Sequence, residues 1–117
     1  MSRTIAAMVF AALMLSSAGS ALAAEAATLS EEKVLLENDR VKVVEVSFKP
    51  GAVDKMKDRS ARVVYYFTDA HFVVTTPDGK TMQRDSKAGN AAWRTQDTTE
   101  VTNVGKEGVK LNVTYLK

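Results

Sequence analysis

The sequence predicts an all-β domain, and three observations support this fold class. About eight short segments rich in Val, Thr and aromatic residues recur at a spacing of roughly 8 to 12 residues. Turns that contain Gly, Pro or Asn separate these segments. After residue 23, no segment has the apolar spacing of an amphipathic helix. Many short strands joined by such turns are typical of a β-barrel or a β-sandwich.

Residues 1–23 have the pattern of a secretory signal peptide. Arg3 is followed by an apolar run at residues 5–15 and by small residues that end in Ala21-Leu22-Ala23. The apolar run has about 11 residues, whereas a membrane-spanning helix needs about 20. We expect cleavage after Ala23, a periplasmic or secreted location in a bacterium, and no membrane attachment of the mature protein.

The composition excludes several classes of partner. The chain has 16 basic and 14 acidic residues and no Cys, so neither a disulfide nor a lipid attached through cysteine is expected. Its Lys and Arg residues are scattered and form no basic stripe, which argues against nucleic-acid binding. One small domain buries a modest core, so we expect it to pair with a second copy as a homodimer.

We divide the mature chain into a loose leader, residues 24–32, and one barrel domain, residues 33–117. The predicted strands are residues 33–37, 40–48, 63–67, 71–76, 81–85, 91–95, 98–104 and 109–116. The second of these strands is apolar on both faces, which predicts burial on both sides or a contact between subunits. In the last strand, Val109, Leu111, Val113 and Tyr115 share one face and should pack in the core.

The turns follow from their residue types. Asn38-Asp39, Pro50-Gly51 and residues 77–80 have the composition of tight turns, with Gly51 and Gly79 able to take positive φ. Residues 68–70 and 105–108 are interpreted as hairpin connections. Between Gly51 and the strand at 63–67 lies an extended polar run in which Lys55, Lys57 and Arg59 recur with period two, so they should share one face.

This central stretch resembles the first motif of the small cupins. That motif has a Gly, five residues, His-x-His, four residues and a Glu. Counting from Gly51 places Lys57 and Arg59 at the two His positions and Val64 at the Glu position. Residues 88–105 resemble the second motif, and the spacing to Asn103 places Thr99 at its His position.

The resemblance covers residues 38–116 and implies a double-stranded β-helix, the cupin or jelly-roll barrel. It also implies that the four usual metal ligands are replaced by Lys57, Arg59, Val64 and Thr99. These side chains suit no divalent transition metal ion, because they offer cations, a methyl group and one neutral hydroxyl. We therefore expect neither a metal nor a cofactor. The chain has one histidine, His71, which is interpreted as a rim residue, with a general base as the alternative.

The implied lumen is the candidate ligand site. Its residues are Lys57, Arg59, Val64, Tyr66, Thr99, Val101 and Asn103. Two inward cations suit a small anionic ligand such as a carboxylate, sulfate or phosphate ester. The alternative is that they pair internally with Asp54, Asp58 or Glu100, or are exposed on a loop.

Three functional classes remain open from the sequence. The first is a non-catalytic, metal-free module that binds a small anion or acts as a dimeric interaction module. The second is a metal-independent isomerase or lyase that uses Lys57, with Tyr65 or Tyr66 nearby. The third is a metalloenzyme with oxygen ligands from Asp54, Asp58, Asp97 and Glu100.

Overall fold

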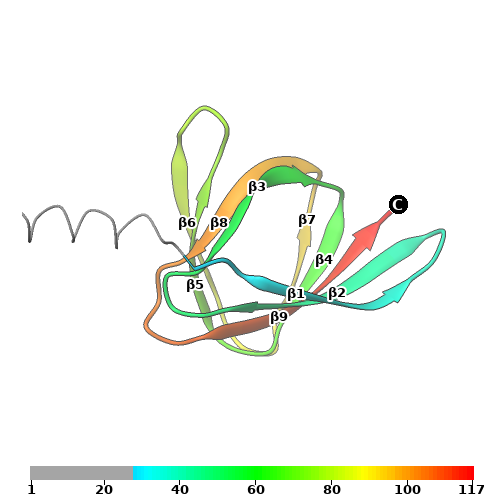
Figure 1. The fold of residues 1–117 in the computed structure, drawn as a ribbon, viewed down its shortest axis with the longest axis horizontal. Coiled ribbons are helices and arrows are strands. Elements are labelled where there is room, and N and C mark those ends of the chain that lie inside the picture. The colour runs from blue at the N-terminus through cyan, green and yellow to red at the C-terminus, as the bar shows by residue number, and fades with distance from the viewer. Residues whose placement is uncertain (1–27) are drawn as a thin grey trace, which may run out of the picture.

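The computed structural model describes residues 28–117, which form two antiparallel β-sheets that face each other (Figure 1). The expected signal peptide and residues 24–27 of the expected leader lie outside the described residues. The nine strands are β1 (Glu31–Glu37), β2 (Val41–Phe48), β3 (Val53–Arg59), β4 (Arg62–Tyr66), β5 (Ala70–Thr75), β6 (Thr81–Ser86), β7 (Ala91–Arg94), β8 (Asp97–Asn103) and β9 (Val109–Leu116). Residues 28–117 include no helix that could cross a membrane.

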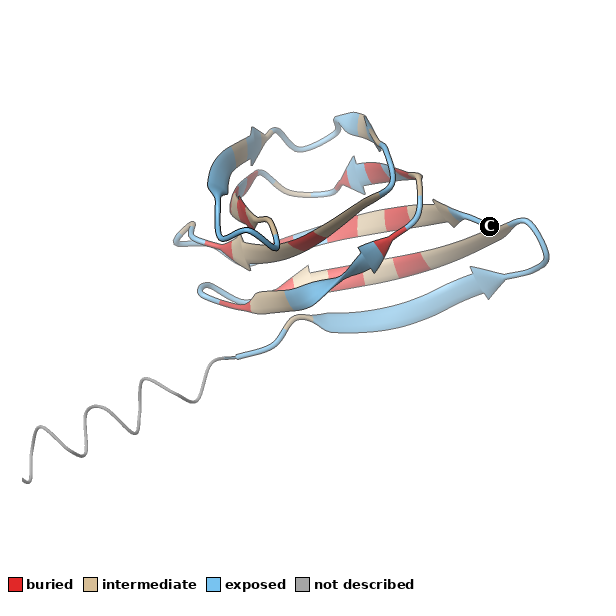
Figure 2. Ribbon diagram, turned by 90° about the horizontal axis from the view of Figure 1, so that it is seen from above, coloured by how far each residue is buried: buried red, intermediate tan, exposed pale blue. Residues whose placement is uncertain are grey.

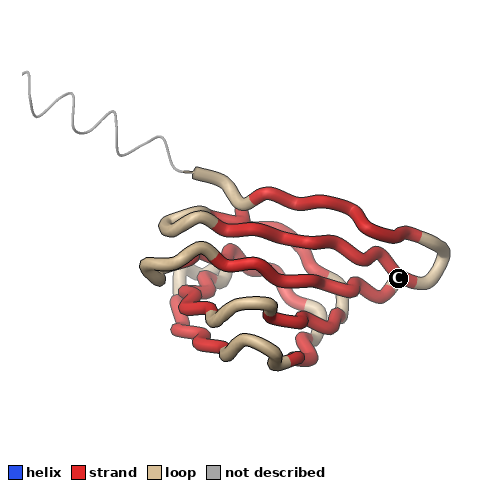
Figure 3. Tube along the Cα trace, turned by 90° about the horizontal axis from the view of Figure 1, so that it is seen from below, coloured by secondary structure: helices blue, strands red, loops and turns tan. Residues whose placement is uncertain are grey.

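The strand order is that of a jelly roll. One sheet has the order β1-β2-β9-β4-β7, and the other has the order β3-β8-β5-β6. Successive strands from β2 to β5 alternate between the sheets, as do β6 to β9, so the chain winds around the barrel. This arrangement confirms the expected all-β barrel, and the fold is visible in Figure 3 as strands and loops throughout the described part.

The core lies between the two sheets, and strand alternation determines which residues enter it. Val109, Leu111 and Val113 of β9 are buried, as predicted from their spacing. On β2, Val44, Val46 and Phe48 are buried, whereas the opposite face with Val41 and Val43 is half-buried, so burial on both faces of this strand is wrong within the described chain and a subunit contact stays a prediction. Figure 2 shows this alternation as buried bands along the strands. The rings of Phe48 and Phe72 join the sheets, with centroids 4.9 Å apart.

Residues 28–37, which comprise β1 and the residues before it, pair with both sheets. The amide of Ser30 donates to the carbonyl of Val53, and the amide of Val53 donates to the carbonyl of Thr28, both at 2.9 Å. The chain then leaves the edge of β3 and pairs with β2 from Glu31 onward. Residues 28–37 therefore close one side of the barrel.

The structure differs from the predicted elements in three places. The first strand begins at Glu31, two residues before the expected boundary at Lys33, because Glu31 already pairs with Ser47 of β2. Residues 53–59 are a strand although they are polar, because they pair with β8. Residues 68–70 and 105–108 are not hairpins, because each connects strands of different sheets.

Candidate functional site

A cavity of about 50 Å³ lies between the sheets. Its apolar wall is made by core side chains, including Val64 and Val101. Its polar wall is dominated by arginines, and of these only Arg59 was predicted from the sequence. The ionisable residues that line it are Asp54, Arg59, Arg62, Arg84 and Arg94, together with the tyrosines Tyr66 and Tyr115.

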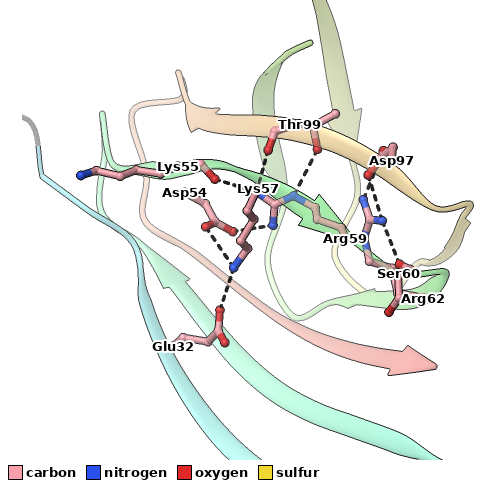
Figure 4. Close-up of polar contacts among 9 residues, drawn as sticks. All are labelled: Glu32, Asp54, Lys55, Lys57, Arg59, Ser60, Arg62, Asp97 and Thr99. Atoms are coloured by element: carbon pink, nitrogen blue, oxygen red, sulfur yellow. Dashed lines mark hydrogen bonds and ion pairs between the residues drawn. The ribbon is translucent and has the colours of Figure 1, made fainter. Parts of the chain in front are cut away.

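Arg59 enters this space from β3 and is fully engaged within the protein (Figure 4). Its Nη1 donates to Oδ2 of Asp54 at 2.9 Å, and its Nε donates to the hydroxyl of Thr99 at 3.1 Å. Its Nη2 donates to the carbonyls of Thr99 at 3.1 Å and Lys55 at 3.4 Å. Arg59 is only 4% exposed, so these contacts replace the water that its guanidinium loses. The alternative of internal pairing with Asp54 is the one observed.

A β-bulge makes this pairing possible. Asp54 pairs with Val101 and Lys57 pairs with Thr99, so the strand holds one extra residue between these two pairs. Without it, Asp54 and Arg59 would lie on opposite faces, because side chains alternate along a strand. The bulge also separates Lys55 from the face shared by Lys57 and Arg59, and the Lys55 side chain points away from the cluster in Figure 4.

Lys57 is placed at the rim rather than in the cavity. Its Nζ lies 3.5 Å from Asp54 Oδ1 and 3.5 Å from Glu32 Oε2, and its side chain is 41% exposed. Tyr65 lies on the opposite, outer face and is exposed, so it is no partner for Lys57. Lys57 thus links β3 to β1 through Glu32.

Arg62 enters from the opposite sheet and is also engaged. Its Nη1 donates to the carbonyls of Ser60 at 3.2 Å and Thr95 at 3.3 Å and lies 3.1 Å from Asp97 Oδ1. Like Arg59 it is 4% exposed. Arg62 therefore anchors the start of β4 to the chain between β7 and β8.

Arg84 and Arg94 differ from these two residues. Within residues 28–117, Arg84 makes no ion pair or side-chain hydrogen bond, and the one such contact of Arg94 is from its Nη2 to the hydroxyl of Tyr66 at 3.5 Å. Both are half-buried. Burial lowers the pKa of Arg84, and the nearby charges of Arg94 and Arg62 lower it further. These are the two cavity cations without a carboxylate partner in the described part of the chain.

The remaining predicted residues divide between the cavity and the barrel end. Val64, Tyr66 and Val101 line the cavity, and Thr99 is buried against Arg59. Asn103 does not line it: its amide Nδ2 donates to the carbonyl of Glu107 at 2.9 Å, and its Oδ1 accepts from the amide of Gly105 at 3.0 Å. It holds the connection between β8 and β9.

The side chains at the positions of the usual cupin metal ligands do not suit a metal ion. Arg59 donates to Thr99, Val64 contributes only methyl groups, and Lys57 forms ion pairs at the rim. In the described residues no three His, Asp or Glu side chains gather as a metal-binding group. His71 lies on the surface, 58% exposed, with its Nδ1 3.1 Å from Asp85 Oδ1.

Comparisons with solved structures identify the fold. No protein-family model and no curated protein matches the chain. A cupin domain from Bordetella pertussis superposes with a TM-score of 0.72 at 24% identity, covering 78% of this chain and 96% of that chain. A cupin-2 conserved barrel protein from Salinispora arenicola has a TM-score of 0.58 at 13% identity, covering 75% of this chain and 76% of that chain.

A third similar structure is the polyketide cyclase RemF of Streptomyces resistomycificus, with a TM-score of 0.58 at 14% identity, covering 77% of this chain and 66% of that chain. These likenesses concern the fold. Residues 28–117 therefore have the fold of small cupin domains.

Proposed function

We propose that the protein is an exported, non-catalytic cupin whose lumen binds a small anionic ligand in place of a metal ion. One observation carries this proposal: four guanidinium groups, those of Arg59, Arg62, Arg84 and Arg94, line a single cavity. Asp54 and Asp97 neutralise two of them through close ion pairs. Two positive charges are left against an apolar wall, where they attract oxyanions more strongly than at an open surface.

The chemistry of the lining favours binding over catalysis. Arginine stays protonated at physiological pH and is a poor proton donor or acceptor, whereas its planar fork suits a carboxylate or phosphate. Lys57, the residue on which the isomerase or lyase alternative depends, lies outside the cavity lining and forms ion pairs with Glu32 and Asp54. No observation on the described residues favours that alternative.

The test is a thermal-shift screen of the purified protein in low salt. The screen covers acetate, short dicarboxylates, sulfate, phosphate, sugar acids, uncharged sugars and divalent metal ions. A ligand that binds only the folded state raises the melting temperature as its concentration exceeds the dissociation constant. We expect one or more anions to raise it, and added KCl to weaken the effect through screening. Stabilisation by a metal or an uncharged sugar alone, or by no compound, would contradict the proposal.

A further inference from the structure

We propose that Arg84 and Arg94 form a clamp for a compact dianionic oxyanion, phosphate or sulfate, either free or as the terminal group of a larger ligand. This inference rests on the proposed function and specifies which cations contact the ligand. It moves the anion site from Lys57 and Arg59, where the sequence indicated it, to the β6–β7 side of the lumen.

Strand register directs both side chains inward. Arg84 of β6 pairs with Phe72 of β5, which is 3% exposed and faces the core. Arg94 of β7 pairs with Arg62 of β4, which is 4% exposed. Paired residues on neighbouring strands share a face of the sheet. Arg84 and Arg94 therefore approach the same cavity from two different sheets.

Arg84 and Arg94 have N–H donors that can bind a ligand. The donors of Arg59 and Arg62 are directed to carbonyls, carboxylates and a hydroxyl, and both side chains are buried. Arg84 has no such partner within residues 28–117, and Arg94 has only the hydroxyl of Tyr66. Two guanidinium forks that are not already engaged provide several N–H groups for the oxygens of one anion.

Tyr66 completes the clamp. Its hydroxyl oxygen accepts from Arg94, so its proton is free to be donated to a ligand oxygen. The side chain is 2% exposed and lines the cavity, which fixes the position of this donor. A buried hydroxyl beside two cations adds a neutral hydrogen bond to an oxyanion without adding charge.

Charge and size together select the ligand class. The cavity arginines exceed their carboxylate partners by two charges, which matches a dianion better than a monocarboxylate. The cavity of about 50 Å³ has room for a few waters, since one water needs roughly 10 to 15 Å³ on this measure. A compact oxyanion fits this space, and a larger ligand must leave the rest of its structure outside.

An anion bound at this site would also reduce the electrostatic repulsion among the cavity arginines of the free protein. Burial lowers the pKa of Arg84 most, and the like charges of Arg94 and Arg62 lower it further, so the three cations oppose one another. Within the described chain, β6 pairs with β5 and β7 pairs with β4, and no ladder joins β6 to β7. An oxyanion held by Arg84 and Arg94 therefore links the two sheets where the backbone does not.

The test is calorimetric titration of inorganic phosphate, sulfate, acetate and glycerol phosphate into the parent protein and into Arg84→Met and Arg94→Met. Arg40→Met, in the exposed turn after β1, is the matched control. We expect phosphate and sulfate to bind more tightly than acetate, and each clamp variant to weaken phosphate binding roughly tenfold to a hundredfold, as expected for charged hydrogen bonds. Arg40→Met should bind as the parent does.

One more variant and a comparison of two phosphate ligands test the geometry of the clamp and the source of the anion. Arg84→Lys keeps the charge and removes the fork, so it should bind phosphate less well than the parent does. Tighter binding of glycerol phosphate than of inorganic phosphate would support a terminal phosphate group, and the reverse would support the free ion. If anions bind the parent but the Arg84 and Arg94 variants keep full affinity, the clamp is wrong and the proposed function stands. If no anion binds the parent, both fail. Circular dichroism establishes that each variant is folded.

Discussion

The guanidinium of Arg59 and the carboxylate of Asp54 meet 2.9 Å apart on the inner face of β3, although five positions separate them in a strand. The bulge at residues 55–56 brings them to the same face, and both are largely buried, at 4% and 15% side-chain exposure. The pair thus depends on an irregularity of the backbone as much as on its charges.

Arg59→Met should destabilise the protein strongly. It leaves the largely buried Asp54 with only the partly exposed Lys57 as a cationic partner. Breaking a buried ion pair typically costs about 3 to 5 kcal/mol of unfolding free energy, and the remaining Lys57 should keep the loss near the lower end of this range. Urea unfolding measures this loss, with Lys55→Met on the exposed side of the same strand as the control. A loss below about 1 kcal/mol, typical of exposed ion pairs, would mean that Asp54 is well solvated.

Asn103→Ala should also be costly, for a different reason. The Asn103 side chain is fully buried and bonds to Glu107, Gly105 and Lys49, so its removal leaves backbone groups unpaired at the barrel end. We expect a loss of about 3 kcal/mol in unfolding free energy, since each buried unpaired group costs about 1 to 3 kcal/mol. Asn90→Ala in the exposed turn before β7 is the control, and equal losses in the two variants would contradict this account.

The β5–β6 turn should contribute a pH-dependent term. The hydroxyl of Thr76 and the amide of Lys80 donate to the Asp78 carboxylate and hold its pKa below the ordinary value of 3.8. A lowered folded-state pKa stabilises the protein above the unfolded pKa, and this stabilisation is lost as pH falls through the folded value. The parent should therefore exceed Asp78→Asn in stability at neutral pH.

Denaturant unfolding of both proteins across the acidic range tests this expectation. The difference in unfolding free energy should stay constant at neutral pH and shrink at pH values below 3.8. A difference that grows on acidification would have the opposite sign and would refute the assigned hydrogen bonds.

Homodimer formation is expected through the outer face of the five-stranded sheet. Val63, Tyr65, Phe67 and Trp93 are exposed there, and Val63 pairs directly with Trp93 across β4 and β7. The rings of Tyr65 and Phe67 lie 5.1 Å apart between centroids. Such a cluster of exposed aromatic residues is typical of an interaction surface.

Sedimentation of Trp93→Arg at micromolar concentration measures this contact. The variant should be monomeric, while Met82→Arg, an equally exposed position on β6, should keep the parent's state. A monomeric parent would exclude the dimer, and a dimeric Trp93→Arg variant would place the contact elsewhere.

Export with cleavage after Ala23 is expected. Ala23→Phe should accumulate uncleaved precursor, because the position before the cleavage site requires a small residue. Mass spectrometry of the cell fractions measures the mature N-terminus, with Ala27→Phe as the control. A soluble periplasmic or secreted protein that still begins at Met1 would overturn this assignment.

The sequence predicted the strands better than it predicted the site. Alternation placed Val109, Leu111 and Val113 in the core, because an apolar period of two needs no knowledge of neighbouring strands. It did not reveal the bulge in β3, since an extra residue changes faces without changing composition. The resemblance to the second cupin motif placed Asn103 in the lumen, but its side chain instead holds the connection between β8 and β9.

Arg84 and Arg94 were missed because their approach depends on the pairing of strands that are distant in sequence. A signal for Arg84 was nonetheless present. The turn at residues 77–80 sets the β5–β6 register. Counting outward from this turn, backward along β5 and forward along β6, pairs Phe72 with Arg84. An arginine opposite a core phenylalanine points inward. No such local count exists for Arg94, whose inward position follows from pairing with Arg62 of β4.

The segment at residues 28–37 protects the barrel from other chains. It covers an edge of β3 at Val53 and the edge of β2 from Lys42 to Ser47, so its removal would bare two strand edges together. Bare edges are templates for aggregation, because their unpaired amides and carbonyls accept a foreign strand. With the segment in place, the outermost edge carries Glu31, Glu32, Lys33 and Glu37, four charges in seven residues, which oppose such pairing. Loss of residues 28–37 would thus threaten solubility before it threatened the ligand site.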